Sequence, residues 1–322
     1  MSAVPPDLEP TLHPLRAIDR DRLERQLSSP ARAWPIEVVE QTTSTNADLL
    51  EALRSERTPP EPASRGSAAL ATPGSAGLAK ARVKVAYEQT AGRGRRGRSW
   101  VAQPGDALLF SVGGWLPRGI EGLGGLSLAV GLAVHDALRE VLRESPVDAA
   151  RVTLKWPNDV LVDGAKVSGI LIETAASTRD STALVVGIGI NLRGAATIAR
   201  EVDQARQANA NATPVSALSA PPTPPTALDA IWPEPSMTDL LARLLNALGA
   251  TFDAFGERGF APLRAAWCEA DSYRNLPVAL YEGGDRPTQG ISRGVDESGH
   301  LLIETDDGLR TISSGDVSLR AA

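Results

Sequence analysis

Arginine and glycine are concentrated in one short segment of this 322-residue chain. Residues 92–98 read GRGRRGR, with four arginines and three glycines in seven positions. Arginine carries a planar, permanently charged group that matches carboxylates and phosphates, and glycine lets a backbone approach an anion closely. The segment therefore predicts a loop that binds a polyanion such as a nucleotide, with a solvated basic turn as the alternative.

The same segment matches the G-x-G-x-x-G pattern of dinucleotide-binding folds, but its surroundings do not fit that pattern. Such a loop must open a helix, whereas residues 99–105, SWVAQPG, have no amphipathic period. The acidic residue expected about 20 positions later at a strand end is also missing. An NAD(P)-dependent oxidoreductase is therefore disfavoured.

Three further segments carry residues that a ligand could contact. Residues 155–159, KWPND, end an apolar run, and Lys166 opens the next one. A lysine there either reaches solvent at the strand edge or directs its ammonium group at a bound anion. In 185–191, VVGIGIN, glycine alternates with apolar residues, which indicates close approach of a ligand or a β-bulge. The cluster 43–46, TSTN, suits a helix N-cap and by itself needs no other role.

Composition limits the classes of protein to which the chain can belong. A formal net charge of −6 disfavours a general nucleic-acid binder. Cys268 is the single cysteine, which excludes a disulfide framework and a cysteine-based metal cluster, and the three histidines lie far apart. The sequence contains neither a long apolar run nor a basic start followed by one. We therefore expect a protein of the cytoplasm.

Apolar periodicity predicts mixed α and β structure around these segments. Expected strands cover 36–40, 83–88, 107–112, 151–156, 166–173 and 182–190. One expected helix begins directly after the TSTN cluster. Four others are expected over 15–27, 124–144, 238–255 and 260–270. Asp163-Gly164 predicts a hairpin turn. From about residue 275, short apolar runs alternate with turn residues, which predicts a small second β-domain.

The expected organisation is a leader over 1–35 with a short helix, a core domain over 36–274 and a C-terminal domain over 275–322. Two segments inside the core, 56–79 and 194–236, are rich in small residues and proline. The second contains seven prolines, which forbid regular structure. We expect both to be irregular insertions, either mobile or acting as lids beside a site.

The order of these segments closely resembles the biotin protein ligases. The likeness covers roughly 36–55, 82–192 and 238–320. Its motifs are TSTN, EQTAGRGRRGRSW, KWPNDV, KVSGILIE, VVGIGINL, FGERGFAPLRAAWCEAD, GISRGVDESGHLLIE and ISSGDVSLR. The resemblance implies an α+β fold, with a mixed-sheet catalytic domain of the biotin/lipoate-ligase type and a C-terminal SH3-like β-barrel. It also implies an ATP-dependent ligase that activates biotin as biotinoyl-5′-AMP. The biotinyl group would then pass to a lysine of the biotin carboxyl carrier protein of acetyl-CoA carboxylase.

The resemblance further implies roles for individual residues. The implied biotin pocket consists of Ser44, Thr45, Asn46, Gln89, Arg93, Gly94, Arg95, Lys166, Gly169 and Leu171. The implied contacts with ATP or the adenylate are Arg95, Arg96, Arg98, Trp100, Lys155, Asn158, Asp159, Gly187, Gly189, Asn191 and Arg320. Lys166, Arg95 and Asp159 are the implied catalytic residues, with Asp159 either orienting Mg²⁺ or assisting the incoming amine. The ligands of Mg²⁺ stay open, and Trp232 is a candidate partner for the adenine ring.

The expected member of the family is monofunctional. Repressor-type members carry an N-terminal winged helix-turn-helix, and a leader of 35 residues with one helix is too short for that module. The expected partners are therefore biotin, ATP and the carrier protein, without DNA or a membrane, and the protein is a monomer or a homodimer. Two alternatives are a lipoate–protein ligase or acyl transferase on the same scaffold, whose members normally lack GRGRRG, and a bifunctional ligase/repressor.

Overall fold

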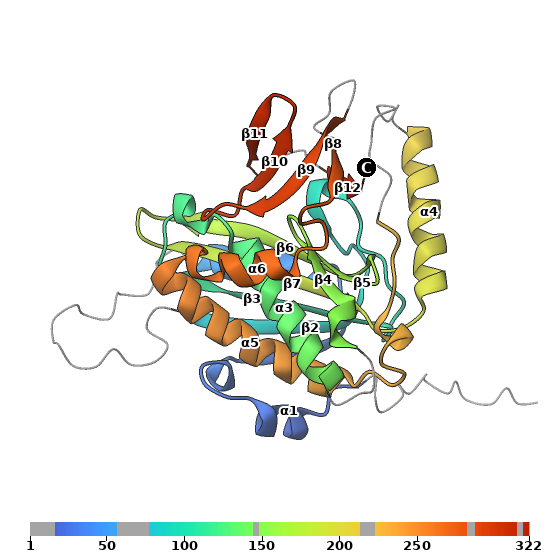
Figure 1. Ribbon diagram of the computed structural model, residues 1–322. Helices are drawn as coiled ribbons and strands as arrows, with labels where there is room; N and C mark the ends of the chain where they lie inside the picture. Colours follow the sequence, from blue (N-terminus) through green and yellow to red (C-terminus); the bar gives the residue numbers. More distant parts are fainter. Residues whose placement is uncertain are drawn as a thin grey trace, which may run out of the picture.

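A seven-stranded mixed sheet runs through the centre of the computed structural model (Figure 1), which describes residues 17–56, 77–143, 148–212, 223–281, 287–313 and 318–321. Its strands are β1 (Ile36–Thr42), β2 (Ala79–Gln89), β3 (Ala107–Leu116), β4 (Val152–Lys155), β5 (Asp159–Val162), β6 (Ala165–Ser177) and β7 (Thr182–Asn191). The strand order is β1-β2-β3-β7-β6-β5-β4, with β1 and β2 parallel and the other neighbours antiparallel. The predicted mixed sheet is confirmed.

Helices cover one face of this sheet and enclose the main hydrophobic core (Figure 1). They are α1 (Arg20–Gln26), α3 (Leu126–Arg143), α5 (Met237–Arg258) and α6 (Arg264–Ala270). Phe252 and Phe255 of α5 are fully buried, as are Val186 and Ile190 of β7, because apolar residues at helical spacing face alternate residues of the strands. Short 3₁₀ turns cover Ala31–Ala33, Arg95–Gly97, Ile120–Leu123, Ala149–Arg151, Leu228–Ala230 and Ala261–Leu263.

The opposite face of the sheet is covered at one end by α2 (Thr45–Ser55). Ser44 caps this helix by accepting the backbone N–H of Ala47. Leu49, Leu50 and Leu53 then pack with Trp115 and Val185 in a second, smaller core. The rest of this face stays open to the site described below.

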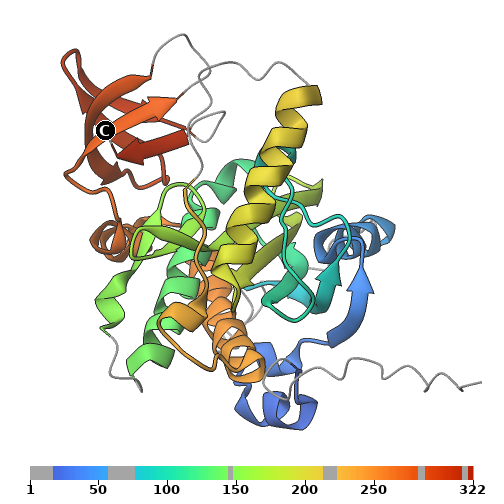
Figure 2. The same ribbon diagram turned by 90° about the vertical axis from the view of Figure 1, so that its right-hand side faces the viewer.

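The strand expected over 151–156 is present as β4, and β5, which forms a hairpin with it after the turn at Trp156–Pro157, was not predicted. One expectation for the core requires correction. The segment 194–236 was expected to be irregular, yet α4 (Ala195–Ala212) occupies its first half (Figure 2). All seven prolines lie beyond residue 212, and the alanine-rich stretch before them favours a helix. The segment 56–79 lies largely outside the described residues.

The C-terminal part of the chain forms a separate antiparallel sheet of five strands (Figure 1). They are β8 (Pro277–Tyr281), β9 (Thr288–Val295), β10 (Leu301–Thr305), β11 (Gly308–Ile312) and β12 (Ser318–Ala321), in the order β11-β10-β9-β8-β12. This agrees with the expected SH3-like domain, while the domain boundaries stay predictions. The indole N–H of Trp156 donates to the carbonyl oxygen of Gly299 at 3.1 Å and joins this sheet to the core.

In the described ranges, no helix combines the length and the apolar character that crossing a membrane requires.

Asp271 is a buried carboxylate between α6 and the C-terminal sheet. It is 9% exposed, its Oδ1 accepts the backbone N–H of Tyr273 at 3.0 Å, and its Oδ2 finds no hydrogen-bond donor among the described residues. Burial raises the pKa of Asp271 from 3.8 to about 6, against the opposing effects of the Tyr273 N–H and the charge of Arg274. At neutral pH, folding therefore buries a poorly compensated charge.

We expect Asp271→Asn to raise the free energy of unfolding at pH 7, by about 3 kcal/mol at most. Because the pKa is higher in the folded protein, the stabilisation by the protonated carboxyl is complete below pH 3.8 and is lost as the pH rises through about 6. Urea titrations across this range should show the wild type losing stability relative to the variant. The exposed Glu269, replaced by Gln, is the control, and a variant no more stable than wild type at pH 7 would contradict the expectation.

Candidate active site

Three glycines leave the open face of the sheet bare beyond α2. Gly169 of β6 lies directly opposite Gly189 of β7, and Gly187 lies between Ser111 of β3 and Leu171 of β6. The register between β3 and β7 is continuous over both strands. The glycines of β7 are therefore not part of a β-bulge, and they mark the close approach of other groups.

Two side chains enter the space that these glycines leave. The indole of Trp100 lies over Gly169 and Gly189, where added Cβ atoms would come within 2.9 and 2.5 Å of the ring. The amide of Asn46 lies over Gly187, where a Cβ would come within 2.2 Å of its Oδ1. Glycine is thus required at all three positions for steric reasons.

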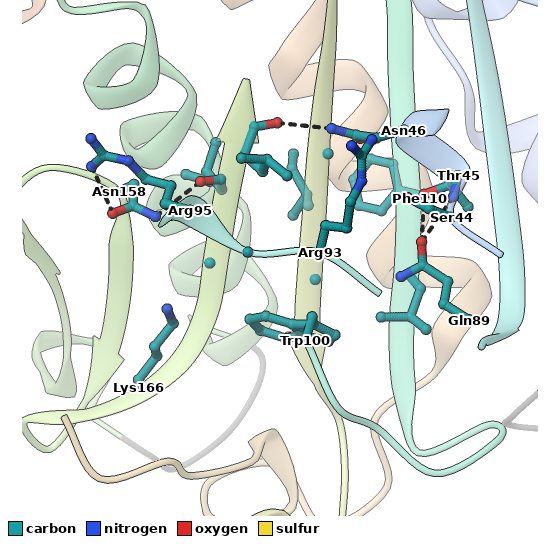
Figure 3. A pocket seen from close by; sticks show the side chains of 18 residues that line it. Ser44, Thr45, Asn46, Gln89, Arg93, Arg95, Trp100, Phe110, Asn158 and Lys166 are labelled. Atoms are coloured by element: carbon teal, nitrogen blue, oxygen red, sulfur yellow. Dashed lines mark hydrogen bonds between the residues drawn. The ribbon is translucent and has the colours of Figure 1, made fainter. Parts of the chain in front are cut away.

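A first cavity lies on this glycine floor (Figure 3). Its lining includes all ten residues that the sequence assigned to the biotin pocket. Figure 3 shows Thr45, Asn46 and Gln89 at one end, Lys166, Arg95 and Asn158 at the other, and Trp100 between them. Sequence reasoning missed four further residues of the lining: Leu109, which pairs with Gly189, and Phe110, Ile170 and Ile188, which belong to the main hydrophobic core.

A chain of hydrogen bonds runs along the polar end of this cavity. Gln89 Oε1 accepts the backbone N–H of Thr45 at 2.8 Å, and Thr45 Oγ1 lies 2.7 Å from Ser111 Oγ. Ser111 in turn donates to Asn46 Oδ1 at 2.6 Å, and Asn46 Nδ2 donates to Glu173 Oε2 at 2.8 Å. Ser111 and Asn46 are 0% and 3% exposed, so the middle of the chain is shielded from water.

Ser111 and Glu173 were not among the residues predicted from the sequence. Both have common residue types in apolar strands, and no motif distinguishes them. Their signal is register: Ser111 pairs with Gly187, and Glu173 lies two residues beyond Leu171 on the same face of β6. Only the pairing of strands far apart in the sequence brings them to Asn46.

A second cavity continues from the first and shares Gly94, Arg95, Trp100, Asn158 and Lys166 with it. It adds the predicted residues Arg96, Arg98, Lys155, Asp159 and Asn191. Ile198 and Val202 of α4 also line it, with Thr223 and Pro225. These four belong to the segment that the sequence suggested was an insertion, and sequence reasoning missed them.

Cations dominate the region where the two cavities meet. Lys166 Nζ lies 2.6 Å from Asp159 Oδ1 and 5.7 Å from the centre of the Trp100 ring. Arg95 donates to Asn158 Oδ1 at 3.3 Å, and Asn158 is held by its own donation to the Ile170 carbonyl oxygen at 2.9 Å. Lys166 therefore points into the site and does not reach past a strand edge to solvent.

The glycine- and arginine-rich segment is a tight hairpin-like loop. The N–H of Gly94 donates to the Arg98 carbonyl oxygen at 2.6 Å, and the N–H of Trp100 donates to the Gly92 carbonyl oxygen at 2.9 Å. Arg96 turns the chain in the left-handed region, with φ of 61°, and Gly97 follows at 69°. The turn directs Arg95 to the junction of the cavities and leaves Arg96 and Arg98 exposed.

The backbone of Lys166 is held by a distant part of the chain. Its N–H donates to the Pro224 carbonyl oxygen at 2.7 Å, and its carbonyl oxygen accepts the N–H of Thr226 at 2.8 Å. Asn191 adds a hydrogen bond to the Thr226 carbonyl oxygen at 2.9 Å. Residues 223–226 thus form a short bridge beside β6, next to the lysine.

Four predicted site residues lie elsewhere than expected or cannot be placed. Gly187 and Gly189 line the first cavity, although they were assigned to the adenylate. Trp232 packs against the hydrophobic core and does not contribute to the described lining of either cavity. The backbone of Arg320 pairs with Ala279 in the C-terminal sheet, but its side chain lies outside the described residues.

The side chains offer few protein ligands for a metal ion. Over the described ranges, no cluster of three or more His, Cys, Asp or Glu residues occurs. Asp159 is the carboxylate that lines the second cavity. One carboxylate fits a Mg²⁺ ion that is bound mainly through phosphate oxygens and water.

We expect Gly187→Ala to lower the free energy of unfolding by about 1–3 kcal/mol, because the added methyl group displaces the Asn46 amide and leaves buried polar groups unpaired. Gly122→Ala is the matched control, since its Cβ would meet Arg118 at an ordinary distance of 3.5 Å. Chemical denaturation of both variants measures the difference. Equal stability of the two would contradict the packing described here.

Comparisons with known proteins agree with this architecture. Residues 69–191 match the Biotin/lipoate A/B protein ligase family, and residues 277–320 match the Biotin protein ligase C terminal domain. A biotin–[acetyl-CoA-carboxylase] ligase of Paracoccus denitrificans is 35% identical over 75% of this chain and 91% of its own length. Its counterpart in Mycobacterium tuberculosis is 31% identical over 93% and 95%.

Two further relatives differ in how much of their own length this chain matches. The bifunctional ligase/repressor BirA of Escherichia coli is 35% identical over 74% of this chain, but the match covers 66% of that protein. The biotin protein ligase of Aquifex aeolicus, solved in complex with biotin and ATP, superimposes with a TM-score of 0.61 at 28% identity. That superposition covers 89% of this chain and 99% of the other. The chain belongs to the biotin protein ligase family.

Proposed function

We propose that this protein activates biotin with ATP and transfers the biotinyl group to a lysine of a biotin carboxyl carrier protein. The observation that carries the proposal is the junction of two unlike cavities at Arg95 and Lys166. Away from the junction, the first cavity is lined mainly by amides, hydroxyls and apolar groups, with Arg93 paired to Glu173, whereas the second adds the cations Arg96, Arg98 and Lys155. This arrangement suits a neutral ring with an acidic tail in the first cavity and a nucleoside triphosphate in the second.

The end of the first cavity that lies away from the junction offers the partners that the ureido ring of biotin requires. That ring has two N–H donors and one carbonyl acceptor and carries no charge. Thr45 and Gln89 present hydroxyl and amide groups, and Leu109 and Trp100 present apolar surface for the remainder of the bicycle. The carboxylate at the end of the tail would then lie at Lys166 and Arg95.

In the first step, a biotin carboxylate oxygen would form a bond to the α-phosphorus of ATP, and the bond from that phosphorus to the pyrophosphate oxygen would break. Two anions must approach one another, so their repulsion has to be offset. The ammonium of Lys166 and the guanidinium of Arg95 provide fixed positive charge at the meeting point. Bound Mg²⁺ would neutralise phosphate charge, and Asp159 and the incoming phosphates would hold it.

In the second step, the amine of the acceptor lysine would attack the acyl carbon of biotinoyl-AMP. An amide bond would form, the bond to the phosphate oxygen would break, AMP would leave and the amine would lose a proton. Asp159 lies at the junction and pairs with Lys166, so it can accept that proton or orient the ion. Trp100 would cover the anhydride against water, because its ring already lies between the two cavities.

The names of two relatives support the carrier protein of acetyl-CoA carboxylase as the acceptor of the biotinyl group. Two similar proteins are named biotin–[acetyl-CoA-carboxylase] ligases, and the Aquifex aeolicus structure contains biotin and ATP. We therefore propose the carrier protein of acetyl-CoA carboxylase as the acceptor. We also propose that the enzyme is monofunctional, that it acts in the cytoplasm and that it does not bind DNA.

Pyrophosphate release tests the proposal directly. The protein is incubated with MgATP, a carrier-protein domain and radiolabelled biotin, with lipoate as the competing acid. We expect biotin-dependent release of pyrophosphate and label on the carrier lysine. Release that depends on lipoate instead would favour the lipoate–protein ligase alternative, and no label from biotin would refute the proposal.

We expect Lys166→Ala and Arg95→Ala each to lower kcat/KM for adenylation by about 100-fold or more, since each removes a charge that stabilises the transition state. Arg54→Ala is the control, because Arg54 is exposed on α2 and lies away from the junction. The three variants are compared by pyrophosphate release under the same conditions. Equal rates in all three would show that the junction is not the reacting centre.

A further inference from the structure

We propose that Glu173 is a positioning residue that fixes the direction of the hydrogen-bond chain in the first cavity. Through Asn46 and Ser111 it makes Thr45 an acceptor towards the ligand, and so selects an acid whose ring donates N–H at that point. The inference rests on the proposed function, because it names how the same cavity distinguishes its acid.

The first step is the contact between Glu173 and Asn46. A carboxylate only accepts hydrogen bonds, and Glu173 Oε2 accepts both Asn46 Nδ2 at 2.8 Å and Arg93 Nη2 at 2.9 Å. Asn46 Nδ2 also donates to the Leu171 carbonyl oxygen at 3.3 Å. Rotation of the Asn46 amide by 180° would place its oxygen against two acceptors. Glu173 therefore directs Asn46 Oδ1 away from itself and towards Ser111.

The second step is a count of protons. Asn46 Oδ1 can only accept, so the 2.6 Å contact takes the proton of Ser111. Ser111 has no second proton, so the 2.7 Å contact takes the proton of Thr45. The third contact, 3.2 Å between Thr45 Oγ1 and Gln89 Oε1, is the longest, and no hydroxyl proton is left for it. The chain thus runs in one direction, from Thr45 through Ser111 to Asn46 and Glu173.

The third step is the consequence for the ligand. With its proton directed at Ser111, Thr45 Oγ1 offers only lone pairs to the cavity that it lines. Gln89 Oε1 already accepts the backbone N–H of Thr45, so the remaining polar group of Gln89 is its NH₂ donor. An acceptor beside a donor complements the N–H and C=O of a cyclic urea. If an acid carries oxygen in place of that N–H, the lone pairs of this oxygen would face the lone pairs of Thr45 Oγ1, and no hydrogen bond could form between them.

Glu173→Gln tests this directional role with little change in shape. Glutamine can donate to Asn46, which lets the Asn46 amide rotate and the chain reverse. We measure kcat/KM by pyrophosphate release for biotin and for its two cyclic carbamate analogues, in each of which oxygen replaces one ureido N–H. Wild type should prefer biotin over at least one carbamate by about 100-fold or more.

In Glu173→Gln, we expect that preference to fall by about 10-fold, through a higher KM for biotin and with the KM for ATP unchanged. A role in stability alone would lower the rates with all three acids equally and leave their ratio as in wild type. If the wild type is active and the variant keeps the wild-type ratio of kcat/KM for biotin to kcat/KM for the carbamates, the role of Glu173 is overturned and the proposed function stands. A wild type that releases no pyrophosphate with biotin would overturn the proposed function and this inference with it.

Two further variants separate the Asn46 contact from the ion pair with Arg93. Asn46→Asp at pH 8 places two carboxylates together, so we expect kcat/KM for biotin to fall by about 100-fold. Adding Glu173→Gln restores a donor opposite the new carboxylate and should recover at least about 10-fold. No recovery would show that Glu173 acts through Arg93. Glu40→Gln, at an exposed position of β1 away from Arg93 and Glu173, is the control and should match wild type throughout.

Discussion

The site depends on a steric constraint in the two central strands. β6 and β7 must fill the hydrophobic core on one face and carry glycine at Gly169, Gly187 and Gly189 on the other, because Trp100 and Asn46 occupy that space. Alternation makes this possible: Val186, Ile188 and Ile190 anchor β7 in the core, while Gly187 and Gly189 lie between them on the opposite face. A rigid, well-packed strand thus provides a floor on which a ligand can lie close to the backbone.

Two carboxylates of the site are paired with cations before any ligand arrives. Asp159 lies against Lys166 at the junction of the cavities, and Glu173 lies against Arg93 at the far end. Each carboxylate holds a cation in place at little cost in side-chain entropy on binding. The pairs also keep the two ends electrostatically distinct, so that excess positive charge faces the cavity proposed for the phosphates and a balanced network faces the proposed ureido ring.

Most of the scaffold was predictable because its signals are local. The helical period of α5, the alternation in β7 and the Asp163-Gly164 turn, where φ is 50° and 77°, each follow from neighbouring residues. The motif residues of the site could be assembled through the likeness to a family. The helix α4 was not predicted, because the prolines after residue 212 indicate irregular structure only for the second half of 194–236 and not for the alanine-rich first half. Ser111, Glu173 and Ile198 were missed because their roles come from strand register and tertiary contact, which no local pattern encodes.

The bridge formed by residues 223–226 also protects the sheet against unwanted association. β7 pairs with β6 only from Ser168 onward, so the peptide groups of Lys166 on that side could pair with a strand from another molecule. Pro224 and Thr226 already satisfy both of these groups, and the neighbouring prolines offer no N–H of their own. The protein can therefore keep a partly exposed lysine at the mouth of the site without leaving its peptide groups open to pairing with other chains.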